Sequence, residues 1–155
     1  MTTSRDDERQ SATGSGVDGR DVHIREWTGP QLSARVNDAM AIYVLAMNYP
    51  GYAGSQRSVT TRRHTTNRGF SCRAALRTDG TLVGFGYGYT TASGQWWHDL
   101  VRKALAPGVA ADWMSDAFEL SEIHVLPTYQ AQGIGHRIIF IRDGKIASDE
   151  AVVKK

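Results

Sequence analysis

The stretch ELSEIHVLPTYQAQGIGH, residues 119–136, carries the strongest pattern in this chain. Apolar and polar residues alternate before Pro127, which predicts a strand over Phe118 to Leu126. A loop follows, and Gly133-Ile134-Gly135 then opens a predicted helix. Main-chain N–H groups at a helix start lack acceptors, and the helix dipole adds positive potential there. The turn therefore predicts an anion cradle suited to phosphate.

The glycine spacing excludes two other kinds of phosphate-binding loop. The chain has no Gly-Lys-Ser or Gly-Lys-Thr, which a Walker loop needs. No Gly-x-Gly-x-x-Gly directly follows a predicted strand, as it does in a dinucleotide-binding fold. A lone Gly-x-Gly is typical of a tight turn, so the signal comes from the whole stretch rather than from Gly133 and Gly135 alone.

The rest of the chain predicts alternating strands and helices behind a polar, disordered leader over residues 1–20. Apolar residues at three- and four-residue steps after Gly29-Pro30 predict a helix that stops before Pro50. Asp79-Gly80 predicts a tight hairpin. The expected strands cover 22–27, 70–77, 82–90 and 118–126, and helices are also expected over 55–66 (helix or loop) and 97–105. This order predicts a mixed α/β or α+β fold.

Glycines alternate with aromatic residues along the third expected strand. Gly84, Gly86 and Gly88 leave one face of that strand without side chains. Two interpretations stay open: close packing of a helix or bulges against the bare face, and a groove for a ligand.

Composition limits the classes of protein. A length of 155 residues fits one domain, and 18 basic against 16 acidic residues give a net charge of +2, which does not indicate a dedicated nucleic-acid binder. No apolar run approaches the ~20 residues of a membrane span, and the polar N-terminus is not a secretory signal. Cys72 stands alone, which excludes an internal disulfide, and no metal site is expected from the histidine spacing. A cytoplasmic domain is expected.

Gln130-x-x-Gly133-x-Gly135, after a strand that ends in Val125-x-Pro127, resembles the acetyl-CoA-binding motif of the GNAT superfamily of N-acetyltransferases. The order of elements over Val22 to Arg137 is also similar. The resemblance implies a mixed, mainly antiparallel sheet flanked by helices. It also implies acetyl-CoA as co-substrate and direct attack on it by a primary amine of a small molecule or peptide.

The resemblance implies a set of binding residues. Gln130 opens the turn, and the main chain of His124 and Val125 pairs with the pantetheine arm as an added strand would. An amide at Val125 would stabilise the thioester oxyanion. The main-chain amides of Gln132, Gly133, Ile134, Gly135 and His136 would hold the CoA pyrophosphate.

The acceptor amine needs a general base. A lysine-like amine has a pKa near ~10.4 and arrives protonated. Glu119 and Glu122 are the candidates on the motif strand; as they are three residues apart, they are expected to face opposite sides of it. We favour Glu119, against the alternative that each is a solvated or helix-facing carboxylate. His124 shares a face with Glu122 and is a second candidate base or a structural residue.

Six arginines occur from Arg57 to Arg77 with no acid between them. They predict a solvated basic face, with attraction of an acidic acceptor or of the CoA phosphates as the alternative. A nucleic-acid-binding module that uses this stretch is a further, weaker hypothesis; no nucleic-acid or membrane partner is expected.

The C-terminal residues depart from the family pattern. A GNAT domain needs about 40 more residues after this motif, and 20 follow Gly135, so an incomplete domain over 21–137 is expected. Residues 138–155 are expected to be a non-family tail: Ile138 to Ile141 predict a strand, with a hairpin turn at Asp143-Gly144, as in the closing hairpin of ABC-transporter ATPase domains. The alternative function is an inactive, truncated remnant that binds CoA weakly or self-associates as a homo-oligomer through an exposed sheet edge.

Overall fold

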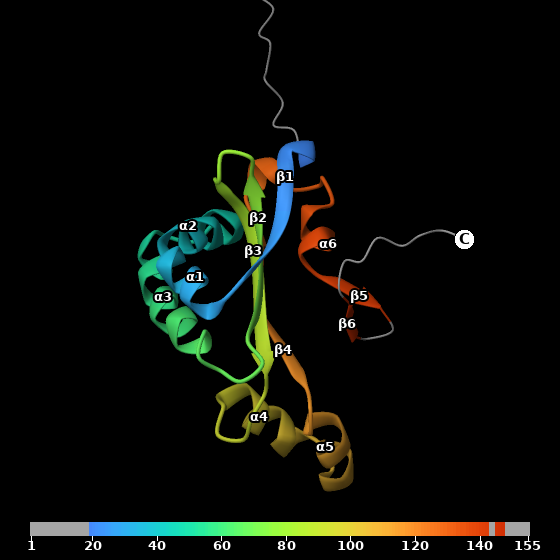
Figure 1. The fold of residues 1–155 in the computed structure, drawn as a ribbon. Coiled ribbons are helices and arrows are strands. Elements are labelled where there is room, and N and C mark those ends of the chain that lie inside the picture. Colours follow the sequence, from blue (N-terminus) through green and yellow to red (C-terminus); the bar gives the residue numbers. More distant parts are fainter. Residues whose placement is uncertain (1–18, 143–144, 148–155) are drawn as a thin grey trace, which may run out of the picture.

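The computed structural model describes residues 19–142 and 145–147, and its centre is a four-stranded antiparallel sheet with helices on both faces (Figure 1). The strands are β1 (Val22–Trp27), β2 (Ser71–Arg77), β3 (Leu82–Thr90) and β4 (Phe118–Val125), in that order across the sheet. The helices are α1 (Gly29–Ala34), α2 (Val36–Met47), α3 (Tyr52–His64), α4 (Trp96–Ala104), α5 (Pro107–Met114) and α6 (Ile134–Ile138). The mixed α/β class expected from the sequence is confirmed.

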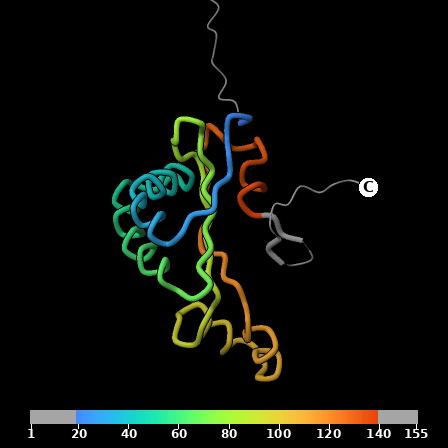
Figure 2. Tube along the Cα trace, in the orientation of Figure 1, coloured from blue at the N-terminus to red at the C-terminus, as the bar shows by residue number. Residues whose placement is uncertain are grey.

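The helices divide into three groups around the sheet. Helices α1, α2 and α3 cover one face and α6 covers the other, while α4 and α5 project beyond one end (Figure 2). The larger core lies under α1 and α2 and is built from Leu32, Val36, Ala39, Met40, Ile42, Cys72, Ala74, Leu82, Phe85, Tyr87 and Tyr89. A smaller cluster under α6 includes Val22, Ala75, Val83, Tyr129, Ile134 and Ile138.

Several element boundaries differ from the sequence prediction. The single helix expected before Pro50 is two helices that meet at Arg35. The first begins with a capping box, in which Thr28 and Gln31 exchange side-chain and main-chain hydrogen bonds. Helix α5 was not predicted, although Pro107 occupies the first helical position that proline favours. Gly19–Asp21 forms a 3-10 turn, and the other residues of the expected leader lie outside the described residues.

The bare face of β3 packs against α6. A Cβ on Gly86 would lie 2.9 Å from Ile138 Cγ2, and one on Gly84 would lie 3.1 Å from Ile138 Cδ1. Glycine at these two positions therefore lets α6 approach the strand closely, and a larger residue would make Ile138 shift. Helix packing, and not a ligand groove, explains these two glycines.

The prediction that a strand begins at Ile138 is wrong. Ile138 is the last residue of α6 and is fully buried, one helical turn after the equally buried Ile134. Burial of this pair against the sheet outweighs the strand preference of the β-branched side chain. The hairpin itself is present, with β5 (Phe140–Arg142) antiparallel to β6 (Lys145–Ala147), and its expected turn at residues 143–144 lies outside the described residues.

Replacing Ile138 by Ala is expected to lower the free energy of unfolding by about 2–5 kcal/mol, because the loss of a buried side chain leaves a cavity. Urea unfolding followed by circular dichroism measures this. Val59→Ala, at a position 71% exposed, is the control and should change the value by less than about 0.5 kcal/mol. Equal effects of the two substitutions would contradict the docking of α6.

Candidate functional site

Strand β4 contains one extra residue relative to β3. Tyr87 pairs with Glu122, but Gly88 pairs with Leu120, so Ser121 has no partner of its own and forms a β-bulge. The extra residue reverses the alternation of side chains along the strand. Glu119, the partner of Tyr89, therefore lies on the same face as Glu122. The prediction that the two glutamates face opposite sides is wrong for this reason.

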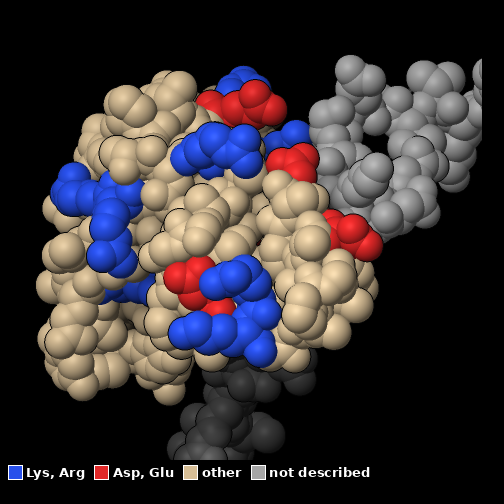
Figure 3. All heavy atoms as spheres, turned by 90° about the horizontal axis from the view of Figure 1, so that it is seen from below, with Lys and Arg blue, Asp and Glu red and all other residues tan. Residues whose placement is uncertain are grey.

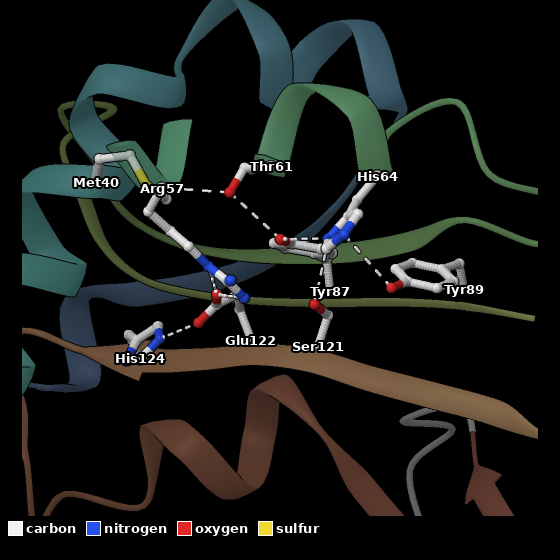
Figure 4. Close-up of polar contacts among 9 residues, drawn as sticks. All are labelled: Met40, Arg57, Thr61, His64, Tyr87, Tyr89, Ser121, Glu122 and His124. Atoms are coloured by element: carbon white, nitrogen blue, oxygen red, sulfur yellow. Dashed lines mark hydrogen bonds and ion pairs between the residues drawn. The ribbon is translucent and has the colours of Figure 1, made fainter. Parts of the chain in front are cut away.

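Glu122 is buried and both of its carboxylate oxygens are engaged (Figure 4). One forms an ion pair and hydrogen bond with Arg57 of α3, and the other contacts His124 Nε2. Burial alone would raise the pKa of Glu122, but the hydrogen bond from His124 and the charge of Arg57 together lower it below its ordinary value. Glu122 is thus a fixed anion that ties α3 and His124 to the strand.

A cleft of about 960 Å³ opens between α3, the end of β3, the start of α4 and β4. Its lining includes Glu119 and Ser121 of β4, His64 of α3, and Trp96 and Trp97, the first two residues of α4. Within the described part of the chain, Glu119 Oε2 is buried without a hydrogen-bond partner. Of the two predicted catalytic residues, only Glu119 lines this cleft.

His64 contributes an imidazole to the cleft that the sequence analysis did not identify. Its Nδ1 lies 3.1 Å from the Tyr87 hydroxyl and 3.3 Å from Ser121 Oγ (Figure 4). Burial, and then the charges of Arg57 and Arg63, lower the pKa of His64, so the ring is neutral at neutral pH. No spacing in the sequence could have found it, because only folding brings α3 next to the bulge.

The predicted phosphate cradle is an open turn. Ala131 and Gly133 have left-handed backbone angles, with φ of 60° and 74°. The N–H groups of Ala131, Gly133, Ile134 and Gly135 donate to no acceptor within the described residues. A Cβ on Gly135 would meet nothing within 4 Å, so the fold does not require glycine there.

The two glutamine side chains of the turn donate hydrogen bonds to main-chain carbonyls of the protein. Gln130 Nε2 donates to the Val125 carbonyl at 3.0 Å, which holds the turn against the end of β4. Gln132 Nε2 donates to the Thr128 carbonyl, and His136 is an exposed residue of α6.

The outer edge of β4 has no neighbouring strand within the described residues. The Leu126 N–H donates to the Val83 carbonyl at 2.8 Å. This bond identifies which residues of β4 direct their main-chain groups toward β3. Because main-chain groups alternate in an antiparallel pair, those of His124 point toward β3 and those of Ile123 and Val125 point to the free edge. The expected main-chain role is therefore wrong for His124 and remains open for Val125.

The arginine stretch does not form one basic face. Its members are spread over α3, a loop and β2, and the view in Figure 3 shows Lys and Arg in separate groups with Asp and Glu among them. Partners are Glu122 for Arg57, the Ser33 carbonyl for Arg62, Asp116 for Arg68, Glu26 for Arg73, and Asp21 and Asp79 for Arg77. Five of the six arginines therefore have a partner within the protein, and the stretch is not one continuous basic face.

Among residues 19–142 and 145–147, no three metal-binding side chains come together, and no helix has the length and apolar character to cross a bilayer. Burial raises the pKa of the Cys72 thiol to about 12, as expected for an inert, buried cysteine.

The chain is 30% identical over 133 residues to the GCN5-like protein acetyltransferase Rv2170 of Mycobacterium tuberculosis. That match covers 69% of the chain and 65% of the relative, so the chain spans less than two thirds of the protein it matches. Among solved structures, the aminoglycoside acetyltransferase HMB0005 from an uncultured soil metagenomic sample has a similar fold, with a TM-score of 0.51 and 15% identity. It covers 76% of the chain, which in turn covers 66% of it. No protein-family model matches the chain.

The sequence match to a GCN5-like protein acetyltransferase and the shared fold support the GNAT resemblance of the motif strand and its open turn.

Glu122→Gln is expected to lower the free energy of unfolding at pH 7 by about 1–3 kcal/mol, because it leaves the Arg57 guanidinium without its counter-charge. The folded pKa of Glu122 is depressed, so its contribution is full above the ordinary value of 4.5 and is lost as pH falls through the folded value. Urea unfolding at several pH values should therefore show the difference between the two proteins shrinking in acid. Asp112→Asn is the control; a difference independent of pH would contradict the ion pair.

Proposed function

We propose that this chain transfers an acetyl group from acetyl-CoA to a primary amine. The observation that carries the proposal is Glu119, a residue that lines the cleft beside the bulge of the strand that carries the CoA motif and whose Oε2 has no hydrogen-bond partner within the described residues. The acetyltransferase names of the relative and of the structural neighbour support the same reaction class. Because its donor is made in the cytoplasm, we propose that the chain acts there.

The turn after β4 fits the CoA pyrophosphate. Successive N–H groups around left-handed residues form a concave donor set for anions, and here the amides of residues 131 and 133–135 have no acceptor among residues 19–142 and 145–147. The space above Gly135 is open, which would allow close approach of a phosphate. The amides of Gln132 to His136 are the proposed contacts, with Gln130 holding the turn in place.

The free edge of β4 fits the pantetheine arm. Its amide and carbonyl groups would pair with the main chain of Ile123 and Val125, which point outward. The Val125 carbonyl already accepts from Gln130, so its N–H is the group left for the ligand. The N–H of Ile123 lies nearer the bulge, and we assign it, in place of Val125, to the developing thioester oxyanion.

Glu119 is the proposed base. A protonated amine in the cleft would lose its proton to this carboxylate, and the neutral nitrogen would then attack the thioester carbonyl directly. Glu122 is unsuited to this step, because Arg57 and His124 occupy its oxygens and stabilise its charged form. His124 is likewise committed to Glu122, which supports a structural role for it.

Gly135→Ala is expected to weaken CoA binding while leaving stability unchanged, because an added Cβ meets no protein atom within 4 Å there but occupies part of the open space. Isothermal titration with CoA measures this. Gly108→Ala is the matched control, since a Cβ there also meets nothing within 4 Å. Absence of heat with the unmutated, folded chain at millimolar CoA would overturn the cradle.

Glu119→Gln is expected to lower kcat/KM for acetyl transfer by about 10²–10⁴-fold with CoA binding retained, because the carboxylate acts on the amine and not on the cofactor. Release of free CoA thiol, with a lysine-containing peptide and an aminoglycoside as probe amines, measures the rate. Glu26→Gln, at an 84% exposed side chain on β1, is the control. Equal rates for both variants would contradict the assignment of Glu119.

A further inference from the structure

The proton positions on His64 follow from a chain of hydrogen bonds that starts in the core. Thr61 is fully buried and donates its hydroxyl proton to Met40 Sδ at 3.9 Å, an atom that can only accept. Thr61 Oγ1 must then accept from the Tyr87 hydroxyl, 3.3 Å away. The Tyr87 oxygen in turn accepts from His64 Nδ1, so Nδ1 carries the proton and Nε2 presents its lone pair (Figure 4).

The lone pair of His64 Nε2 faces Tyr89. The Tyr89 hydroxyl lies 3.5 Å from Nε2, a long contact of the kind that tightens when substrate binds. Tyr89 is also the direct cross-strand partner of Glu119, and both residues line the cleft. The Tyr89 side chain also interacts with the Glu119 carboxylate through its hydroxyl, so this hydroxyl links the proposed base to the imidazole.

We propose that His64 accepts, through the hydroxyl of Tyr89, the proton that Glu119 removes from the acceptor amine. This rests on the proposed acetyl transfer. His64 acts through Tyr89 and does not touch the reacting atoms. This transfer would return Glu119 to its deprotonated form before the next turnover. His64 would then release the proton to solvent.

The relay balances over one turnover. The ammonium of the acceptor gives one proton to Glu119, which passes it to the Tyr89 oxygen as the Tyr89 proton moves to His64 Nε2. The amine nitrogen then bonds to the acetyl carbon, and the carbon–sulfur bond breaks to leave CoA thiolate. The second amine proton goes to that thiolate. The products are the amide, CoA thiol and one proton on His64, which leaves to water.

Charges around His64 favour the neutral ring that the relay needs. Arg57 and Arg63 on α3 lower the pKa of the imidazole together with burial, and Glu122 on β4 opposes them. Tyr87 and Tyr89 face the ring from β3; burial and the nearby Glu119 raise the pKa of Tyr89 to about 12, so its hydroxyl keeps a proton to transfer. The ring should accept a proton from Glu119 and lose it again readily near neutral pH.

His64→Asn tests the relay, because the Asn amide can still donate to Tyr87 in place of Nδ1 but offers no base toward Tyr89. With the amine that the unmutated chain acetylates best in the peptide and aminoglycoside assay, kcat/KM should fall about 10²-fold. Activity of the unmutated chain is expected to fall in acid as His64 becomes protonated, at a pH below the ordinary histidine pKa, and this acid limb should be absent from His64→Asn. Tyr89→Phe should reproduce both effects, and the double variant should lose no more than either single one.

Matched controls are His23→Asn on β1 and Tyr52→Phe, at an exposed ring on α3; both should behave like the unmutated chain. Nitrogen-15 NMR of the His64 imidazole in the unmutated chain should find Nδ1 protonated and Nε2 unprotonated at pH 7. This measurement does not depend on whether the variants fold. Protonation at Nε2, or an acid limb retained in His64→Asn and Tyr89→Phe, would overturn the relay alone. No transfer by the unmutated chain to either probe would instead overturn the proposed function.

Discussion

The extra residue in β4 controls the chemistry of the α1–α3 face. With regular alternation, Glu119 and Glu122 would lie on opposite sides of the sheet, and one of them would face α6. The bulge at Ser121 brings both carboxylates to the same side. It also places Ser121 Oγ against His64, so a motif strand, a hairpin strand and a helix distant in sequence share one polar cluster. Everything proposed for the cleft depends on this single change of register.

The two carboxylates differ because of their surroundings and not because of their chemistry. Arg57 and His124 satisfy Glu122, which fixes α3 against the sheet and so holds His64 in place. Glu119 has no such partners at Oε2, although that oxygen is equally removed from solvent. A buried acceptor without a donor is costly, which is a common property of groups kept for function rather than for stability.

The amino-acid sequence predicted much of the fold. The four strands lie within one residue of their predicted ranges, Asp79-Gly80 predicted the hairpin, and the alternating glycines of 82–90 predicted a face without side chains. Errors arose where tertiary contacts outweigh local preference. Ile138 is helical because its burial on the sheet outweighs its strand preference, and His64 carries no local signal because its partners lie on β3 and β4.

The sequence by itself determined the order of the four strands, the glycine turn expected at residues 132–136 and the family resemblance, because these depend on glycine conformation and on short-range patterns. Only the tertiary structure decided which glutamate reaches the cleft, which main-chain groups of β4 stay free and which histidine joins the site. Each of these depends on pairing register, and register is fixed by contacts between segments far apart in the chain.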